Sequence, residues 1–296
     1  MKKILFPYES IGSEENAFIH AAEFAQKYNA ELIILHAFTF PVDDNISQEK
    51  YQTKLRERWI DVTHEIGALK RVFMQDYLHG DRINFRFSYT IVFGKLIPEL
   101  HHCLKTEKVD LLVLSTPYFD EERSVLTGSS LQSLLEKIKV PVLTVPANHK
   151  YEPIKKIAYA TDLKRVKGSA DMLTLVEDLA KRFKAKLNFV HISMDGKLSE
   201  VNDKLTLRLM ESKVKLHPEL FSFEVYRCDS ALKGMSEFVK RRNVDMVVVI
   251  RQTRNFFESM FHESFSNQIS VYSKEPVLIL NDGTILTEDF LNQNKN

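Results

Sequence analysis

The chain has 296 residues, of which 44% are hydrophobic and 27% are charged, and its formal net charge is +1. These values are typical of a globular protein long enough for two domains, and they argue against a disordered or fibrous chain. The nearly neutral charge provides no global basic field that would gather nucleic acid or anionic lipid. We therefore expect neither nucleic acid nor a membrane as a partner.

Short apolar runs alternate with amphipathic stretches along the first half of the chain. Nearly uninterrupted runs such as "ELIILHAF" and "DLLVLS" indicate strands that are buried on both faces. In chain order, the pattern predicts strands at 2–7, 31–37, 83–91, 110–115 and 141–146, with helices at 14–28, 47–74, 96–106 and 129–138. Strands that alternate with helices predict an α/β fold with a parallel sheet and right-handed crossovers.

The second half repeats the first. "KKILFPYES" at 2–10 resembles "KKIAYATDL" at 155–163, and "VDLLVLS" at 109–115 matches "VDMVVVI" at 244–250. The second copy predicts strands at 155–161, 186–192, 221–227, 245–250 and 276–280. We expect one domain at 1–148, a second at 153–281 and a polar tail at 282–296, with the boundary in "ANHKYEPIK".

The last strand of each copy, "VPVLTVP" or "EPVLILN", is more apolar than one exposed sheet edge should be. We expect these two strands, 141–146 and 276–280, to pair antiparallel and so to pack the halves as a pseudo-dimer. A homodimer through the long stretches 47–74 and 199–214 is a further expectation.

Cysteine usage and the first residues bear on location. Cys103 and Cys228 are far apart and lack metal-type spacing, which argues against a disulfide framework and indicates buried thiols in a reducing compartment. "MKKILFPYES" has too few apolar residues before Pro7 for a signal sequence. These features lead us to expect a cytoplasmic protein.

The order of these elements resembles the universal stress protein family. The residues that carry the resemblance are an acid after the first strand, an "LH" strand, "VDLLVLS", a Gly-Ser helix start and "VPVLTVP", with a looser second copy. The resemblance implies a tandem member with two flavodoxin-like (Rossmann-like), doubly wound domains, each holding a five-stranded parallel sheet. It also implies, for some members, an ATP site.

The family's nucleotide motif, Gly-x2-Gly-x9-Gly-Ser/Thr with an acid after the first strand, is degenerate in both copies. In the first copy the glycine places hold Ser115, Tyr118 and Gly128, and the acid is Glu9. By resemblance, the candidate contacts to ATP or another adenine nucleotide are Pro7, Tyr8, Glu9, Ala37, Ser115, Gly128, Ser129 and Ser130. A glycine at a helix start exposes backbone N–H groups to phosphate.

The second copy has lost different parts of the motif. Asp162 keeps the acid, but the glycine places hold Ile250, Thr253 and Glu263, and a carboxylate repels phosphate. The weaker candidates in this half are Asp162, Arg251 and Ser264.

Two interpretations from different classes stay open. One is a stress-response protein without a dedicated catalytic site that binds an adenine nucleotide in its first half and at most hydrolyses it slowly. The other is a nucleotide-free interaction protein, in which Thr127 or Ser129 only caps the helix 129–138. A flavin or redox protein has only fold analogy in its favour.

Other patterns have simpler explanations. Gly94-Lys95 is a turn into a helix, since Tyr89 stands where a P-loop needs glycine. "KRRN" at 240–243 is a solvated helix end, and adjacent His101-His102 cannot face one site from a helix. His36 and His191 end equivalent strands, where a structural role is expected rather than a metal site.

Overall fold

The computed structural model describes residues 1–9, 14–39, 47–78, 83–116, 137–160, 170–193, 221–251 and 274–281. The chain forms two compact units, Met1–Ser115 and Thr116–Asn296. Each unit is a flavodoxin-like α/β arrangement, as the sequence predicts. The expected domain spans 1–148 and 153–281 refer to the repeat in the sequence and stay a prediction.

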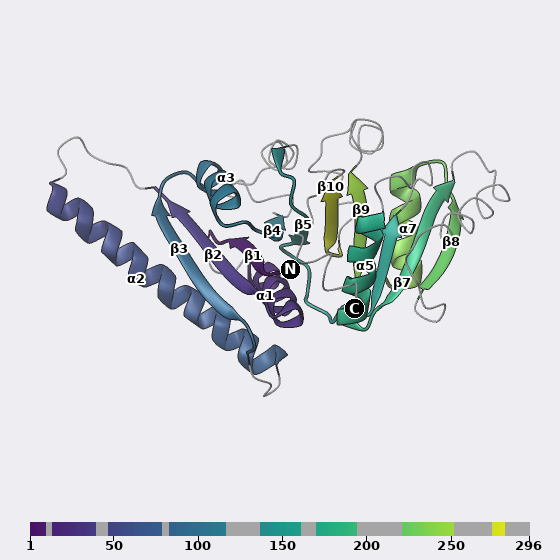
Figure 1. The fold of residues 1–296 in the computed structure, drawn as a ribbon, viewed down its shortest axis with the longest axis horizontal. Helices are drawn as coiled ribbons and strands as arrows, with labels where there is room; N and C mark the ends of the chain where they lie inside the picture. Colours follow the sequence, from purple (N-terminus) through teal and green to yellow (C-terminus); the bar gives the residue numbers. More distant parts are fainter. Residues whose placement is uncertain are drawn as a thin grey trace. The chain divides into compact units, whose positions relative to one another are not determined.

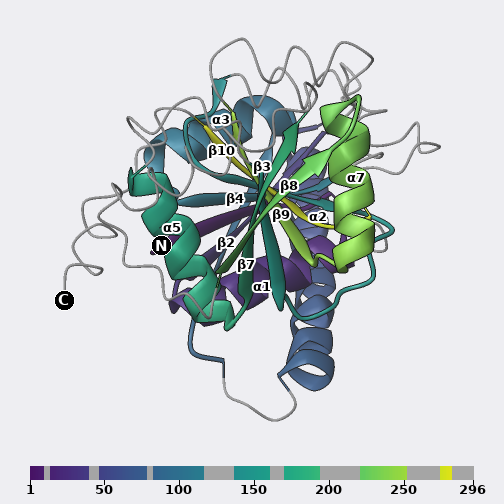
Figure 2. The same cartoon turned by 90° about the vertical axis from the view of Figure 1, so that its right-hand side faces the viewer.

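The first unit alternates strands and helices as expected (Figure 1). Its elements are β1 (Lys3–Pro7), α1 (Glu15–Tyr28), β2 (Glu31–Phe38), α2 (Gln48–Val72), a π-helical turn (Phe73–Tyr77), β3 (Arg86–Phe93), α3 (Leu96–Thr106) and β4 (Leu111–Thr116). The strand order is β3-β2-β1-β4, and the β1–β2, β1–β4 and β2–β3 pairs are all parallel. Helices α1 and α3 lie on opposite faces of β1 and β2 (Figures 1 and 2).

The second unit contains the remaining strands. Its described elements are β5 (Val142–Pro146), β6 (Lys156–Ala160), α5 (Ala170–Phe183), β7 (Lys186–Ser193), β8 (Phe221–Arg227), α7 (Ala231–Arg242), β9 (Met246–Arg251) and β10 (Val277–Asn281). The strand order is β5-β10-β9-β6-β7-β8. Helices α5 and α7 lie on opposite sides of these strands (Figure 2), which is the doubly wound arrangement.

The expected pairing between the two terminal strands is confirmed. β5 and β10 run antiparallel, and Leu143 lies opposite Leu278. Both leucines are fully buried, because each apolar edge covers the other instead of facing water. This pairing also explains why β5, the last strand of the first sequence repeat, lies in the second unit.

The repeat is visible in the backbone as well as in the sequence. α1 and α5 are each followed by a residue with positive φ, Asn29 at 49° and Lys184 at 53°, and then by a buried alanine. Lys108 and Asn243 also have positive φ, at 51° and 49°, and each is followed by a buried valine before β4 and β9. Left-handed residues end helices by satisfying the last carbonyl groups, so each half turns from helix to strand in the same way.

The central strands are buried on both faces, as their apolar runs predict. Of the five residues of β1, four are buried, and β5 is buried throughout. β3 and β8 are the outer strands, and most of their residues are half-buried or exposed. The core of the first unit includes Phe6 against Phe18, with ring centroids 6.0 Å apart in an edge-to-face arrangement.

Candidate functional site

The carboxyl ends of β1, β2 and β4 meet at the point where the strand order of the first unit reverses. The chain moves outward from β1 to β2 and β3, then returns to place β4 on the other side of β1. Ligands of open α/β sheets bind at this reversal, outside the carboxyl ends of the strands. This edge is therefore the candidate site.

Register brings four of the predicted residues to two successive levels of this edge. Leu5 pairs with Leu112, so the third residue after each, Tyr8 and Ser115, reach the same level. Pro7 pairs with Leu35, so Glu9 and Ala37 follow two residues later on adjacent chains. The Tyr8 backbone N–H donates to the Leu35 carbonyl oxygen at 2.8 Å, which extends the β1–β2 ladder to the site.

Burial separates these residues into a surface and a floor. Glu9, Ala37 and Ser115 are half-buried, whereas Pro7 and Tyr8 are buried. His36 and Thr116 are also buried, 2% and 4% exposed. Glu9, Ala37 and Ser115 therefore form the accessible part of the edge, and a ligand there would rest on the buried residues.

The Tyr8 side chain forms a hydrogen bond with α2. Its hydroxyl donates to Glu65 Oε2 at 2.8 Å, and the residue is 1% exposed. Burial, and then the hydrogen bond to Glu65, raise the pKa of the phenol far above its usual range. Tyr8 is thus a neutral donor in the floor, and only its backbone faces the edge.

His36 lies beside Tyr8 and has a defined tautomer. Its Nδ1 lies 2.7 Å from the Tyr8 carbonyl oxygen. A carbonyl can only accept, so Nδ1 carries the proton and Nε2 is left as an acceptor. Burial lowers the pKa of the imidazole, which keeps the ring uncharged. Nε2 is buried and has no hydrogen-bond partner among the described residues.

Aromatic rings continue from His36 toward the outer strand. The His36 ring stacks on Phe38 with centroids 5.7 Å apart, and Phe38 contacts Phe93 at 6.0 Å. Tyr51 of α2 contacts Phe93 at 5.6 Å. These contacts and the Tyr8–Glu65 hydrogen bond hold α2 against the carboxyl ends of β1, β2 and β3.

Carboxylates dominate the charge of the described edge. The buried Glu14, just before α1, accepts the Glu9 backbone N–H at 2.6 Å. Arg58 lies 3.5 Å from Glu65 and balances that carboxylate. The described edge is therefore suited to hydroxyl and amine donors of a ligand, and not to its phosphate groups.

Several predicted residues fall outside the described part of the chain. These are Tyr118, Gly128, Ser129 and Ser130 in the first half and Asp162, Thr253, Glu263 and Ser264 in the second. Arg251 is the last residue of β9. The expected helices 129–138 and 199–214 and the tail 282–296 likewise lie almost wholly outside it.

The role of α2 at this site is not among the features predicted from the sequence. Helix α2 confirms the stretch expected at 47–74, but Glu65 was not singled out. The signal was available, because Val62, Ile66 and Leu69 form the buried stripe of the helix and Glu65 lies within it. His36 and His191 are confirmed at equivalent places, each the sixth residue of an eight-residue strand.

Two further observations concern metals and membranes. Among the described residues, no group of three or more His, Cys, Asp and Glu side chains is arranged to hold a metal ion. No helix in the described ranges combines the length and apolar character that a membrane span requires.

Comparison with known families agrees with this geometry. Residues 1–146 match the model of the Universal stress protein family. No curated protein matches the sequence.

Solved structures share the fold over nearly the whole chain. A universal stress protein from Archaeoglobus fulgidus is 14% identical with a TM-score of 0.65, covering 95% of this chain and 98% of its own. A putative universal stress protein from Pseudomonas aeruginosa is 15% identical with a TM-score of 0.58, covering 99% and 96%. The cytoplasmic domain of a prokaryotic cation chloride cotransporter is 10% identical with a TM-score of 0.57, covering 96% and 97%. Such identities establish the fold and not the activity.

Proposed function

Because residues 1–146 of the chain belong to the universal stress protein family, we propose that this is a stress-response protein that acts by binding and holds an adenine nucleotide in its first unit. The observation that supports this is the convergence of Glu9, Ala37 and Ser115, all half-buried, at the carboxyl ends of β1, β2 and β4. That place is the reversal of strand order at which such sheets take their ligands.

The charges of the edge orient the nucleotide. Glu9 provides a carboxylate that suits the hydroxyl donors of a ribose, and Ala37 leaves room for a flat base beside β2. The phosphates must lie elsewhere, since the carboxylates of Glu9 and Glu14 would repel them. Backbone N–H groups at Gly128, Ser129 and Ser130 are the proposed phosphate seat.

One nucleotide per chain is the proposed stoichiometry. In the second half Asp162, Arg251 and Ser264 are the weaker candidate contacts, and Glu263 stands where the first half has Gly128. A carboxylate at the phosphate seat opposes an anion by charge and by bulk.

Release and rebinding of nucleotide test this proposal. Freshly purified chain is denatured, released nucleotide is identified by mass spectrometry, and ATP binding is measured by calorimetry. Ala37→Trp, which fills the edge, should weaken ATP binding in the first unit at least tenfold, and Gly128→Glu should abolish ATP binding in that unit. Thr53→Trp adds the same ring on the exposed side of α2 and should leave binding within twofold. Absence of both released nucleotide and ATP heat would reject the proposal.

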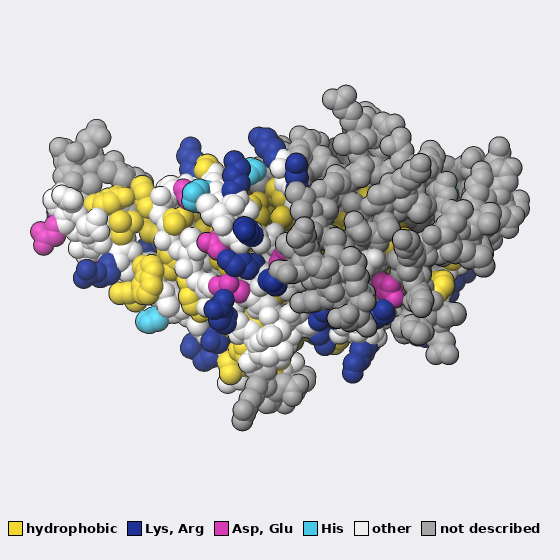
Figure 3. All heavy atoms as spheres, in the orientation of Figure 1, with side chains coloured by type: hydrophobic (Ala, Val, Ile, Leu, Met, Phe, Trp, Pro, Cys, Tyr) yellow, Lys and Arg dark blue, Asp and Glu magenta, His cyan; other side chains and the backbone are white. Residues whose placement is uncertain are grey.

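A nucleotide-free interaction protein is the second candidate, favoured by exposed apolar side chains on α2 and β3. Trp59 and Ile60 are 52% and 42% exposed, and Tyr89 and Phe93 on the outer strand are similar. Figure 3 shows hydrophobic side chains along this part of the first unit. Exposed patches of this kind mark interaction surfaces. Light scattering of the wild type and of Trp59→Lys tests the homodimer expected through this helix. The wild type should have twice the mass of one chain, and the variant should have the mass of one chain.

A further inference from the structure

An open cavity in the second unit is lined by four cationic side chains. Lys156 and Lys186 begin β6 and β7, and Arg241 and Arg242 end α7. The cavity has a volume of about 520 Å³, within the range of small-ligand sites. It lies at the amino ends of its strands, whereas the candidate nucleotide site of the first unit lies at the carboxyl ends of that unit's own strands.

The two lysines are direct neighbours. Lys156 and Lys186 are register partners in the parallel β6–β7 pair, and adjacent strands lie about 4.8 Å apart. In the first unit the equivalent partners are Lys3 and Glu31, an attractive pair. Like charges opposite one another on a sheet are destabilising, so the second unit has a cost at this point that the first does not.

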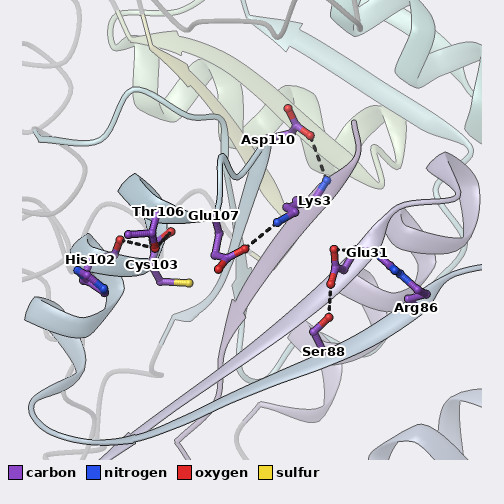
Figure 4. A network of polar contacts seen from close by, with 9 residues as sticks. All are labelled: Lys3, Glu31, Arg86, Ser88, His102, Cys103, Thr106, Glu107 and Asp110. Carbon is purple, nitrogen blue, oxygen red and sulfur yellow. Dashed lines mark hydrogen bonds and ion pairs between the residues drawn. The ribbon is translucent and has the colours of Figure 1, made fainter.

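The helix ends near these lysines also differ in charge between the two units: α3 is followed by Glu107, whereas α7 ends with Arg242. In the first unit Lys3 Nζ donates to Glu107 Oε2 at 2.6 Å, and this bond raises the pKa of the lysine (Figure 4). The residue equivalent to Glu107, which likewise lies three places before the aspartate, is Arg242. Lys156 Nζ instead donates to the Arg242 carbonyl oxygen at 3.0 Å, which is an uncharged acceptor.

The first unit is locally neutral and the second is not. Arg86 pairs with Glu31 at 3.1 Å, so each of the two cations there has its own carboxylate (Figure 4). Among the described residues that line the cavity, Glu224 is the only carboxylate, and it pairs with Arg242. In this described part of the lining, four cations face one carboxylate, which makes it strongly positive.

Helix-end electrostatics explain only part of this cluster. Cations in the last turn of a helix complement its dipole, and that accounts for Arg241 and Arg242 as the solvated helix end expected from the sequence. It does not account for Lys186, which belongs to a strand and repels its neighbour Lys156. An anionic ligand would remove this repulsion.

We propose that this cavity binds a small molecule with at least two phosphate groups. The cations would hold the phosphates, since Lys186, Arg241 and Arg242 are exposed and Lys156 is half-buried. The half-buried Phe221 offers a ring to the organic part, and Ser222, whose hydroxyl donates to Asn188 Oδ1 at 2.6 Å, provides polar contacts. This site is independent of the nucleotide site proposed in the first unit.

The test is calorimetry of the full chain with sodium tripolyphosphate at fixed ionic strength. Lys186→Glu restores the opposite-charge pair found in the first unit, so it should fold well while it weakens binding at least about tenfold. Lys233→Glu makes the same charge change on the exposed face of α7 away from the cavity and should change binding less than twofold. Circular dichroism confirms that both variants are folded.

Several outcomes would overturn the proposal. They are an absence of heat with millimolar tripolyphosphate, an equal loss in both variants, and binding only to vesicles of acidic phospholipid or to nucleic acid. ATP also carries phosphates, so Ala37→Trp separates the two sites. That variant should lose nucleotide binding in the first unit and keep tripolyphosphate binding in the second. Lys186→Glu should keep nucleotide binding in the first unit and lose tripolyphosphate binding in the second.

Discussion

Asp110 ties the start of β4 to the start of β1, because its Oδ2 accepts the backbone N–H groups of Lys2 at 2.6 Å and Lys3 at 3.0 Å. Asp245 does the same in the second unit for Lys155 at 2.8 Å and Lys156 at 2.7 Å. The "VD" that recurs in the two copies therefore has a structural reason. The carboxylate satisfies the first donors of the neighbouring strand, which has not yet entered its ladder.

Removing this carboxylate should destabilise the first unit. Asp110→Ala leaves two backbone donors without their acceptor, and we expect a loss of about 1–3 kcal/mol in the free energy of unfolding, measured by urea titration. Asp61→Ala, at an exposed position of α2, is the matched control and should change stability by less than about 0.5 kcal/mol. Equal stabilities of the two variants would contradict the role of Asp110.

Glu275 should make the second unit less stable as the pH rises. Burial, and then Asp245 and Glu152, raise the pKa of its carboxyl to about 7. His149 Nδ1 is 3.6 Å away, but burial lowers the pKa of that imidazole, so it adds little positive charge at neutral pH. The folded state thus binds the proton more tightly than the unfolded state does. The stabilisation is complete below about pH 4 and is lost as the pH rises through 7.

Glu275→Gln tests this pH dependence. At pH 8 the variant should be more stable than the wild type by about 1–3 kcal/mol, and the difference should nearly vanish at pH 4. Urea unfolding at the two pH values measures it. Glu57→Gln, on the exposed side of α2, should retain the wild-type pH dependence. A stability gain that is the same at both pH values would show that the effect is not ionisation.

The two thiols should differ in reactivity. Cys103 is buried, and burial raises its pKa to about 11, whereas Cys228 is half-buried. At pH 8 only about one Cys103 in a thousand is the reactive thiolate. Alkylation of the folded protein should therefore label Cys228 first. Cys103→Ser should leave the fast labelling unchanged and Cys228→Ser should remove it, while both thiols react in urea. Fast labelling of Cys228→Ser would contradict this.

The sequence by itself determined the α/β class and each strand in the described part of the chain, with strand ends shifted by up to three residues. It could do so because strands buried on both faces need continuous apolar runs, and the helices between them need amphipathic stripes. It also predicted the antiparallel β5–β10 pair, since two apolar edges have few other ways to leave water.

Only the tertiary structure decided what the polar residues do. Register and helix placement bring Tyr8 to Glu65 over 57 positions of sequence and set Lys156 beside Lys186. Tyr8 stays a predicted ligand contact, and the structure adds that its side chain bonds to Glu65. The residues of "KRRN" form the exposed helix end expected from the sequence. Three of them, Arg241, Arg242 and Asn243, also line the basic cavity. Hydrophobic periodicity depends on residues that are close in the chain, so it can be recognised in the sequence. Electrostatic interactions depend on distances in the folded structure, which the order of residues alone does not give.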